Sequence, residues 1–442
     1  MKKWFLPSML LFVSILSTNA QMNKIQFVEY DMPNGLHVIL HEDHTTPNVI
    51  VSVMYHVGSK NENPERTGFA HFFEHLLFEG SDNIGRGEYA KYVEKAGGSL
   101  NANTTWDRTF YYDLVPSNQL ELGLWLESER MLHAKVENKG IETQRQVVKE
   151  ERRMRIDNRP YGTLIENAMK RAFKVHPYNW PIIGSMAHLD AAKEEDYVNF
   201  YKTYYVPNNA ILSIAGDLNI EDAKKLASKY FGDIPKGTRP VNRPTVVEPP
   251  LTSEIRDTIY DNVQLPMVAQ TYRIPANGTP DYYAVSLLAQ LLSKGESSRL
   301  NKALVDEQQK AVNIGAFPID MEDPGVTLIY GISNMGIDPG DMEKAMDAEI
   351  EKVQNNLIGD DEFQKLKNQV ENDFVSSNST IAGIAESLAN YKMYLGDTHL
   401  INAEIDRYMK VTKEDIKRVA NQYFKKNNRV VLYFLPKSSK KA

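Results

Sequence analysis

The sequence predicts an α+β protein in which one unit of sheet and helices occurs twice. The 442 residues exceed the roughly 250–300 residues at which a single hydrophobic core stops growing. The segment that ends the first half, EEDYVNFYKTYYVPNNAILSIAGD, resembles KEDIKRVANQYFKKNNRVVLYFLP near the C-terminus. Between them, residues 235–250 hold five of the 21 prolines, which is typical of a linker. We therefore expect two similar α/β units joined by a Pro-rich linker.

The internal repeat is supported by constant spacings. Asp196 matches Asp415 and Asn209 matches Asn428, in both cases 219 residues apart (415 − 196 and 428 − 209). Tyr205 likewise matches Phe424. Nearer the start of each half, HLLFEG matches QLLSKG at a spacing of 215 residues (290 − 75). We expect a first domain over residues 21–234, a linker over 235–252, a second domain over 253–436 and a basic tail over 437–442.

The N-terminus has the pattern of a signal peptide. Lys2 and Lys3 precede an apolar run from Trp4 to Leu16, and small residues before Gln21 offer a cleavage site. The run is shorter than the ~20 residues that a spanning helix needs. We expect residues 1–20 to be removed and the protein to be exported to the bacterial periplasm or outside the cell, without stable membrane insertion. An uncleaved membrane anchor is the alternative.

Composition excludes two classes of function. The formal net charge of −7 provides no basic surplus for binding nucleic acid through its phosphates. The chain has no cysteine, so it forms neither disulfides nor thiolate metal sites. Hydrophobic residues at 42% and charged residues at 25% are typical of a globular protein.

The first half alternates strand and helix patterns. FVEYD and LHVILH flank the turn MPNG, and residues 49–57 form an apolar run that predicts a buried strand. A polar loop, GSKNENPERTG, then precedes a helix. Further helices are expected at about 87–96, 117–132 and 138–157, with strands between about 99 and 115.

The helix after that loop, GFAHFFEHLLFEGS (residues 68–81), carries His71, Glu74 and His75 among Phe and Leu. Positions i, i+3 and i+4 share one face of a helix, so the two imidazoles and the carboxylate point the same way. The matching positions in the second half are Ser286, Ala289 and Gln290, so the repeated fold does not require the polar trio. Two core histidines bonded to backbone carbonyls, with Glu74 reaching water, are the structural alternative.

Two imidazoles one helical turn apart can share a zinc ion. A catalytic zinc site takes three protein ligands and leaves one position open, so an acid or a histidine is needed from elsewhere. The helical pattern IETQRQVVKEERRMRID offers Glu150 and Glu151, about 100° apart on the helix. Either could instead be a solvated acid that pairs with one of the arginines beside it.

Several spaced motifs carry a resemblance to a known family. The order H-x-x-E-H is the inverzincin signature. Together with GGSLNANTTWDRTFYY, QRQVVKEERRMRIDNRP, HPYNWPIIGS and FYKTYYVPNNAILSIAGD, the chain resembles the pitrilysin, insulysin and mitochondrial processing peptidase family in its short bacterial two-domain form. The resemblance covers about residues 24–435 and implies that each unit is a largely antiparallel sheet with packed helices. It also implies one Zn²⁺ per chain and, by its spacing, Glu151 as the third ligand.

The chain departs from this family at two places. Relatives usually carry an acid seven residues before the third ligand as an outer support, and this chain has Gln144 there. Self-sufficient relatives also carry an Arg and a Tyr that hold the substrate, and this chain has Val305 and Val312 at the corresponding positions. In two-subunit relatives a homologous chain supplies that pair. We therefore expect a heterodimer with such a chain, with a homodimer as the alternative.

The function expected from the sequence is zinc-dependent hydrolysis of peptides. Glu74 would act as the general base toward the attacking water. Asn101, Ala102 and Asn103 resemble the edge strand along which the family binds an extended peptide, although an ordinary polar strand fits them equally well. A non-catalytic peptide-binding or scaffolding subunit is the second hypothesis. His176 and Trp106 lie in family-like segments, and we expect both to be structural.

Overall fold

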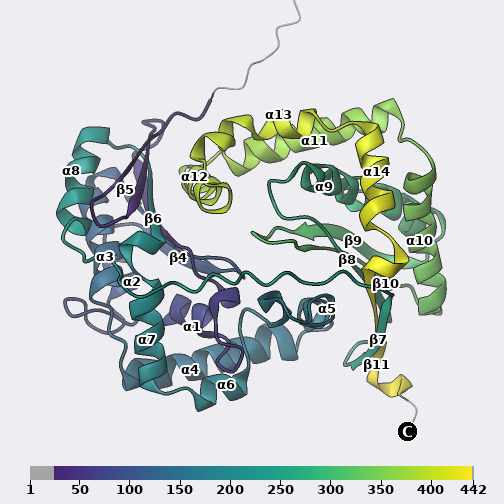
Figure 1. The fold of residues 1–442 in the computed structure, drawn as a ribbon, viewed down its shortest axis with the longest axis horizontal. Helices are drawn as coiled ribbons and strands as arrows, with labels where there is room; N and C mark the ends of the chain where they lie inside the picture. Colours follow the sequence, from purple (N-terminus) through teal and green to yellow (C-terminus); the bar gives the residue numbers. More distant parts are fainter. Residues whose placement is uncertain (1–23, 441–442) are drawn as a thin grey trace, which may run out of the picture.

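A computed structural model describes residues 24–440 of the chain. It consists of two halves that lie side by side, each built on one β-sheet with helices packed against it (Figure 1). The expected signal peptide, residues 1–20, lies outside the described residues.

The first sheet has the strand order β1-β2-β6-β3-β5-β4. Its neighbouring strands are antiparallel except for β2 and β6, which run parallel. The edge strand β4 alternates between more and less exposed residues at its start, and β6 is buried throughout. The strands are β1 (Val28–Asp31), β2 (His37–Glu42), β3 (Asn48–Tyr55), β4 (Ser99–Thr104), β5 (Thr109–Pro116) and β6 (Ala210–Gly216).

The second sheet repeats this topology without a counterpart of β1. Its order is β7-β11-β8-β10-β9, and it matches β2-β6-β3-β5-β4 strand for strand, including one parallel pair, β7 with β11. The predicted fold class of two largely antiparallel α+β units is therefore confirmed. The strands are β7 (Ile255–Asp261), β8 (Met267–Arg273), β9 (Ala311–Ile319), β10 (Val326–Ser333) and β11 (Arg429–Pro436).

The helices also occur in a similar order in the two halves. Those of the first half are α1 (Phe69–Leu76), α2 (Tyr89–Lys95), α3 (Leu120–Leu132), α4 (Asn138–Arg152), α5 (Leu164–Ala172), α6 (Met186–Ala191), α7 (Glu194–Tyr204) and α8 (Ile220–Phe231). Those of the second half are α9 (Pro280–Ser293), α10 (Pro339–Asn355), α11 (Asp360–Ser377), α12 (Ile381–Leu395), α13 (Glu404–Met409) and α14 (Lys413–Tyr423).

Matching residues of the repeat make matching hydrogen bonds. The side-chain amide of Asn209 donates to the carbonyl of Tyr204 at 2.8 Å, and that of Asn428 donates to the carbonyl of Tyr423 at 2.7 Å. At the starts of the preceding helices, Asp196 and Asp415 each accept a hydrogen bond from the backbone N–H three residues earlier. The asparagine bonds fix the turns from α7 to β6 and from α14 to β11 in the same way, and the aspartate bonds cap the starts of the two helices alike.

The two halves exchange a helix. The α5 helix of the first half packs on β8 and β11 of the second sheet, where Met169 and Ala172 join a core with Ala269 and Leu432. In return, α12 of the second half packs on the first sheet. There Ile384 and Leu388 lie against Ile39, Met54, Phe110 and Ile211. Figure 1 shows α5 and α12 on the side of the partner sheet. Each sheet therefore has part of its apolar face covered by the other half.

A buried ion cluster also joins the halves. The ammonium of Lys60, which is 3% exposed, lies 2.7 Å from Asp107 of the first half and 2.5 Å from Glu322 of the second. His56 lies 2.9 Å from the same Glu322 oxygen. We call Lys60, His56, Asp107 and Glu322 the inter-half cluster, and it fixes the turn between β9 and β10 against the first half.

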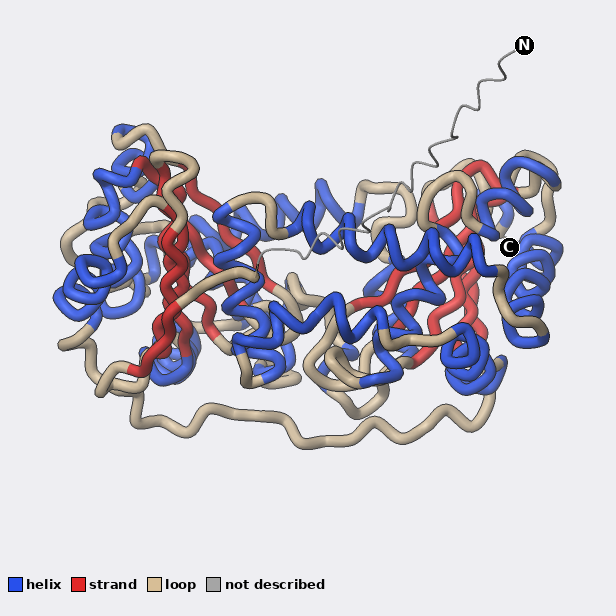
Figure 2. Tube along the Cα trace, turned by 90° about the horizontal axis from the view of Figure 1, so that it is seen from above, coloured by secondary structure: helices blue, strands red, loops and turns tan. Residues whose placement is uncertain are grey.

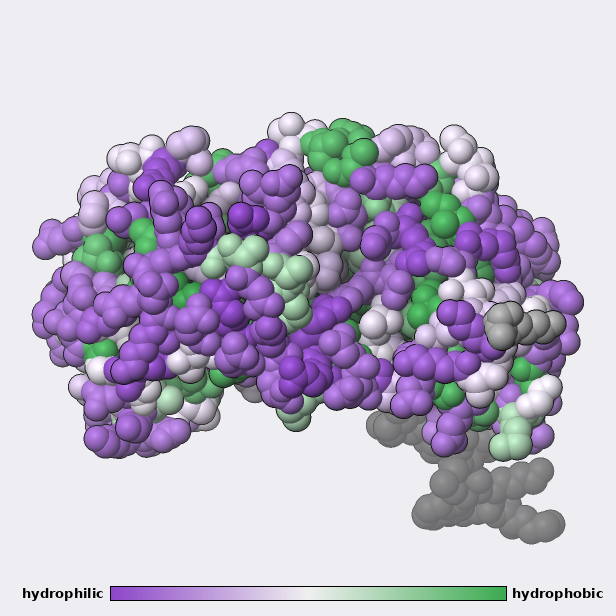
Figure 3. Space-filling view, turned by 90° about the horizontal axis from the view of Figure 1, so that it is seen from below, coloured by the Kyte–Doolittle hydropathy of each residue, from purple (hydrophilic) through white to green (hydrophobic). Residues whose placement is uncertain are grey.

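Residues 235–254 contain neither helix nor strand, and a long loop runs between the two halves (Figure 2). The face of the molecule shown in Figure 3 is mainly hydrophilic, with hydrophobic side chains in small, separate patches. Among the described residues, no helix combines the length and the apolar composition needed to cross a membrane.

Candidate metal centre

The α1 helix presents the polar trio on one face and an aromatic face on the other. Phe72 and Phe73 are fully buried and stack against Tyr197, Phe200 and further aromatic rings of α7. Because this apolar face is fixed in the core, the opposite face must carry His71, Glu74 and His75. One nitrogen or oxygen atom of each of these three lies within 4.8 Å of the others.

A second carboxylate reaches the two histidines from α4. Oε2 of Glu151 lies 3.0 Å from Nε2 of His75 and 3.4 Å from Nε2 of His71. The structure therefore brings together the three side chains that the sequence predicted as ligands. It does so between α1 and α4, which pack directly against each other.

The donor atoms fit a zinc ion. Oε2 of Glu151 is buried and forms no hydrogen bond with any described residue, although an ionised carboxylate oxygen can accept one, and it faces Nε2 of both histidines. Ligand atoms around tetrahedral zinc, at bond lengths of about 2.1 Å, lie about 3.4 Å from one another. The measured separations of 3.0 and 3.4 Å are close to this spacing. Neutral imidazole and carboxylate are also ligands that zinc accepts.

The electrostatics keep two of the candidate ligands, His71 and Glu151, in forms that can bind a metal. Burial, with a smaller effect from His75, lowers the pKa of His71 to about 4, so this imidazole is neutral at pH 7. Burial raises the pKa of Glu151, but its interactions with His75 and His71 outweigh that effect and hold the pKa below its ordinary value. Burial raises the pKa of Glu74, against the opposing effects of Thr104 and His75.

Glu150 and Glu151 have different surroundings, as their separation around the helix requires. The Glu150 side chain is 53% exposed and pairs with Arg153. Glu151 is 15% exposed, and while Oε2 faces the histidines, Oε1 pairs with Arg155 at 2.7 Å. The solvated-acid alternative thus describes the surroundings of Glu150, whereas Glu151 faces the candidate centre.

A cleft of about 720 Å³ opens beside the trio. Glu74, His75 and Glu151 line it together with Asn101 and Ala102 of β4. Within the described residues, β4 pairs with β5 alone, so its outer edge has free main-chain groups facing this region. Asn103 is not among the lining residues, and its side-chain oxygen instead accepts a hydrogen bond from Arg108.

The remaining predicted residues lie further from the centre. Gln144 donates a hydrogen bond to Glu79, which also pairs with Arg86. Val305 packs at the margin of the second core, and Val312 lies on β9 with about half of its surface exposed. His176 is buried, and its ring accepts a hydrogen bond from the Tyr178 backbone.

Trp106 is also buried, and its indole donates to the carbonyl of Trp180. Like His176, it therefore makes contacts within the fold and lies apart from the residues that line the cleft.

Sequence reasoning missed the walls of the cleft. Val147, Met154 and Phe78 line it, and Met154 is 67% exposed. Val147 and Glu151 follow the spacing i, i+4 and so share one face of α4, and Met154 follows just after the end of this helix. That periodicity was visible in the sequence once Glu151 was placed.

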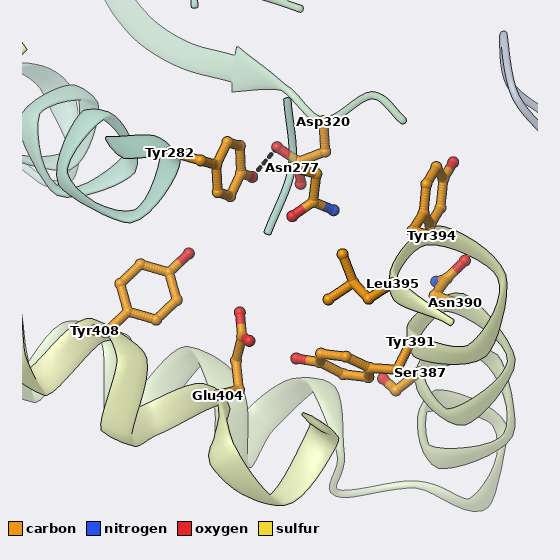
Figure 4. A pocket seen from close by; sticks show the side chains of 10 residues that line it. All are labelled: Asn277, Tyr282, Asp320, Ser387, Asn390, Tyr391, Tyr394, Leu395, Glu404 and Tyr408. Carbon is orange, nitrogen blue, oxygen red and sulfur yellow. Dashed lines mark hydrogen bonds between the residues drawn. The ribbon is translucent and has the colours of Figure 1, made fainter. Parts of the chain in front are cut away.

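Another cavity, of about 200 Å³, lies wholly in the second half. The side chains around it include four tyrosines, Asp320 and Glu404, and Tyr282 donates a hydrogen bond to Asp320 (Figure 4). No histidine lines this cavity, so it lacks the imidazole ligands found beside α1.

Two family models match the chain. Residues 37–185 match the insulinase family (peptidase family M16), and residues 192–370 match the peptidase M16 inactive domain. The second range contains Ser286, Ala289 and Gln290, which replace the polar trio.

Individual relatives agree with these matches. The zinc protease PqqE of Helicobacter pylori is 31% identical over 98% of both chains. A probable mitochondrial-processing peptidase subunit beta of Arabidopsis thaliana is 25% identical over 89% of this chain and 75% of its own length. The crystal structure of a protease from Helicobacter pylori superposes with a TM-score of 0.89 at 30% identity, covering 93% of this chain and all of that one. The chain belongs to the M16 peptidase family, and its relatives include proteins named zinc proteases.

Proposed function

We propose that the chain is a zinc-dependent endopeptidase or oligopeptidase that cleaves extended peptides in the cleft between α1, α4 and β4. His71, His75 and Glu151 would hold one zinc ion per chain. The observation that carries the proposal is the approach of one Glu151 oxygen to both imidazoles, inside a cleft that also contains Glu74 and the free edge of a strand.

Each side chain has a distinct part in the reaction. A bound zinc ion supplies Lewis acidity, which makes a water molecule more acidic and polarises a peptide carbonyl. The free edge of β4 binds the substrate main chain as an added strand, with Asn101 and Ala102 beside the cleaved bond and Asn103 supporting the strand through Arg108. Glu74 accepts the proton of the attacking water and delivers it to the leaving amine as the C–N bond breaks.

The Glu74→Gln variant tests this assignment. It keeps the size of the side chain and leaves all three ligands in place, so the protein should retain one zinc per chain. Peptide turnover should fall about 10²- to 10⁴-fold, because the general base is lost. Zinc content by elemental analysis and kcat on an unstructured peptide are the two measurements.

The matched control for this experiment is Glu150→Gln, because Glu150 lies on the same cleft but pairs with Arg153 in solvent. This variant should change neither zinc content nor turnover. Unchanged turnover in Glu74→Gln would remove Glu74 from the role of base.

The proposal includes a homologous partner subunit. Val305 and Val312 stand where the resemblance places an Arg and a Tyr, and a valine side chain donates no hydrogen bond to a substrate carbonyl. A second chain of the family would supply the missing donors. Full activity of the purified chain as a monomer would contradict this part of the proposal. Full activity as a homodimer would favour the homodimer alternative and would show that the Arg and Tyr of a homologous chain are not required.

A non-catalytic role in peptide binding is the second candidate, and the same two valines favour it. A structural subunit would contain no zinc and would show no chelator-sensitive cleavage, either alone or mixed with a homologous chain. The assembled ligand set supports the catalytic proposal over this one. The N-terminal sequence pattern further supports export to the periplasm or beyond.

A further inference from the structure

The helix that carries the candidate ligands is too short to hold itself in place. The α1 helix has eight residues, and isolated helices shorter than about 12–15 residues are marginal in water. Its neighbours must therefore fix the direction in which His71 and His75 point. Contacts at both ends of the helix supply this restraint.

At its N-terminus, α1 is capped by a residue outside the helix. The usual capping position is Gly68, which has φ of 97° and no side chain to offer. A Cβ atom there would lie 2.7 Å from the carbonyl oxygen of Ile183, so the close approach of this loop requires glycine. Glu62 takes over the cap. Its two carboxylate oxygens accept hydrogen bonds from the backbone N–H groups of Gly68 and Ala70, both at 2.8 Å.

Glu62 is well suited to this position because it is fully enclosed. It is 3% exposed and forms no ion pair with any described residue. Burial raises the pKa of Glu62 to about 8, against the opposing effect of the backbone N–H groups of Ala70 and Gly68. Glu62 therefore acts on α1 through its hydrogen bonds to those two groups. Ala70, which it binds, directly precedes His71.

At its C-terminal end, α1 is held through two carbonyl oxygens. The hydroxyl of Tyr111 donates to Phe73 at 2.8 Å, and the guanidinium of Arg130 donates to Leu77 at 3.3 Å. Arg130 is 1% exposed, and it lies 4.3 to 4.4 Å from the ring centroids of Phe78, Tyr89 and Tyr111. The Arg130 cation, which also pairs with Glu127 at 3.0 Å, lies at the end of the helix whose dipole favours positive charge.

The matching helix of the second half is restrained differently, because its C-terminal carbonyl at Ser293 accepts a hydrogen bond from the neutral amide of Asn301 at 3.3 Å. The α9 helix has 14 residues and begins with Thr279 and Pro280, and no side chain caps it through Thr279. It also carries no ligands. The buried Glu62 cap and the Arg130 cation therefore accompany the helix that carries the proposed ligands, and they are not a general requirement of the repeated fold.

We propose that Glu62, Tyr111 and Arg130 form a clamp that positions α1 for metal binding, with Glu62 as its principal positioning residue. This inference rests on the proposed zinc site. Without the clamp, α1 frays and the imidazoles spend less time at the spacing that one ion requires. The loss should appear as weaker zinc binding and as faster opening of α1.

The test compares Glu62→Gln with Asp338→Asn, a matched change at a helix that bears no ligand. Asp338 caps α10 through the N–H of Gly340. Glu62→Gln should weaken zinc binding about tenfold, as the loss of outer partners of metal ligands does. It should also speed amide hydrogen exchange at residues 69–77 of the zinc-free protein, while α9 is unchanged. Asp338→Asn should alter exchange at the start of α10 and leave zinc affinity as it was.

Tyr111→Phe provides a second variant that removes one hydroxyl only. It should produce the same two changes to a smaller extent, and it serves as the main test if Glu62→Gln does not fold. Folded variants with wild-type zinc affinity and wild-type exchange in α1 would overturn the clamp. If the wild-type protein bound no zinc, the proposed function would fail. The hydrogen-exchange measurement on α1 would still decide whether the clamp restrains this helix. If it bound zinc without cleaving peptides, only the catalytic part would fail.

Discussion

The two halves of the molecule share a topology but differ in the helix that follows their second matched strand. In the first half this helix is α1, short and clamped at both ends, with two histidines and a glutamate on its free face. In the second half it is α9, longer and with Ser286, Ala289 and Gln290 at the corresponding positions, where Ser286 and Ala289 are buried. The two halves keep the same framework of sheet and helices, whereas only the first half carries the proposed ligand set. The comparison therefore teaches that the fold does not depend on those three side chains.

The largest expected effect is the loss of the metal from the first half. His71→Ala combined with His75→Ala should lower zinc content from one ion per chain to none, and peptide cleavage should fall by about a thousandfold or more. Elemental analysis and a cleavage assay measure the two effects. Zinc that remained at one ion per chain would show that the second half, or another site, holds the metal.

The next effect separates two adjacent acids on α4. Glu151→Gln should weaken zinc binding by more than about a hundredfold, because loss of an outer partner alone costs 10- to 100-fold. Glu150→Gln should bind zinc as the wild type does, since Glu150 is exposed and pairs with Arg153. Competition with a zinc-binding dye measures both constants. Equal losses of zinc affinity in the two variants would mean that the total negative charge of α4 attracts the ion and that Glu151 is not a ligand.

A smaller effect concerns the inter-half cluster and its dependence on pH. Burial raises the pKa of Glu322, but the hydrogen bond from His56 and the charge of Lys60 outweigh it and hold the pKa at about 2, against an ordinary value of 4.5. Since the folded pKa is lowered, the stabilisation is present above pH 4.5 and is lost as the pH falls toward 2. Glu322→Gln should reduce the free energy of unfolding by about 2 kcal/mol at pH 7.

At pH 3 the difference in the free energy of unfolding between Glu322→Gln and the wild type should be clearly smaller than at pH 7. Urea unfolding of the zinc-free proteins at both pH values measures it. Lys229→Met, which removes an exposed pair with Glu121, is the control and should have little effect at either pH. A difference that stayed constant between pH 7 and pH 3 would contradict the role of the ionised carboxylate.

The smallest expected effect is a change in stability at matching turns of the two halves. Asn209→Ala and Asn428→Ala remove matching amides that bond to Tyr204 and Tyr423. Each should lower the free energy of unfolding by about 1–2 kcal/mol, the usual result of leaving a buried acceptor without its donor. Thermal unfolding is sufficient to compare them. A large loss of stability in one variant alone would contradict this expectation. It would show that the two turns have the same shape but contribute differently to the free energy of unfolding.

Patterns in the sequence were sufficient to predict the fold class and to place the polar trio on one helix face. The constant spacing of the repeat predicted the two units, and helical periodicity placed His71, Glu74 and His75 on one face. The geometry of α4 left Glu150 and Glu151 open, and the family resemblance favoured Glu151. The structure shows the reason for the difference, because one face of α4 meets α1 while the adjacent position meets solvent.

Contacts between distant segments could not be predicted in this way. Glu62 lies in a polar loop and has the sequence context of a surface acid, and its burial depends on a loop more than 100 residues away that approaches Gly68. The packing of α5 and α12 on the sheet of the other half was not predicted, because helical periodicity does not say which sheet covers an apolar face. Gln144 was expected to act as an outer support of the ligands, and only the fold reveals that it bonds to Glu79.

The exchange of α5 and α12 means that the boundary between the two repeats in the polypeptide is not a boundary in the folded molecule. A protease cut within residues 235–254 would divide the chain but leave each fragment with a helix inserted in the other. The fragments should therefore remain associated after nicking and melt together. Separate expression of either repeat would instead leave one face of its sheet without its natural cover.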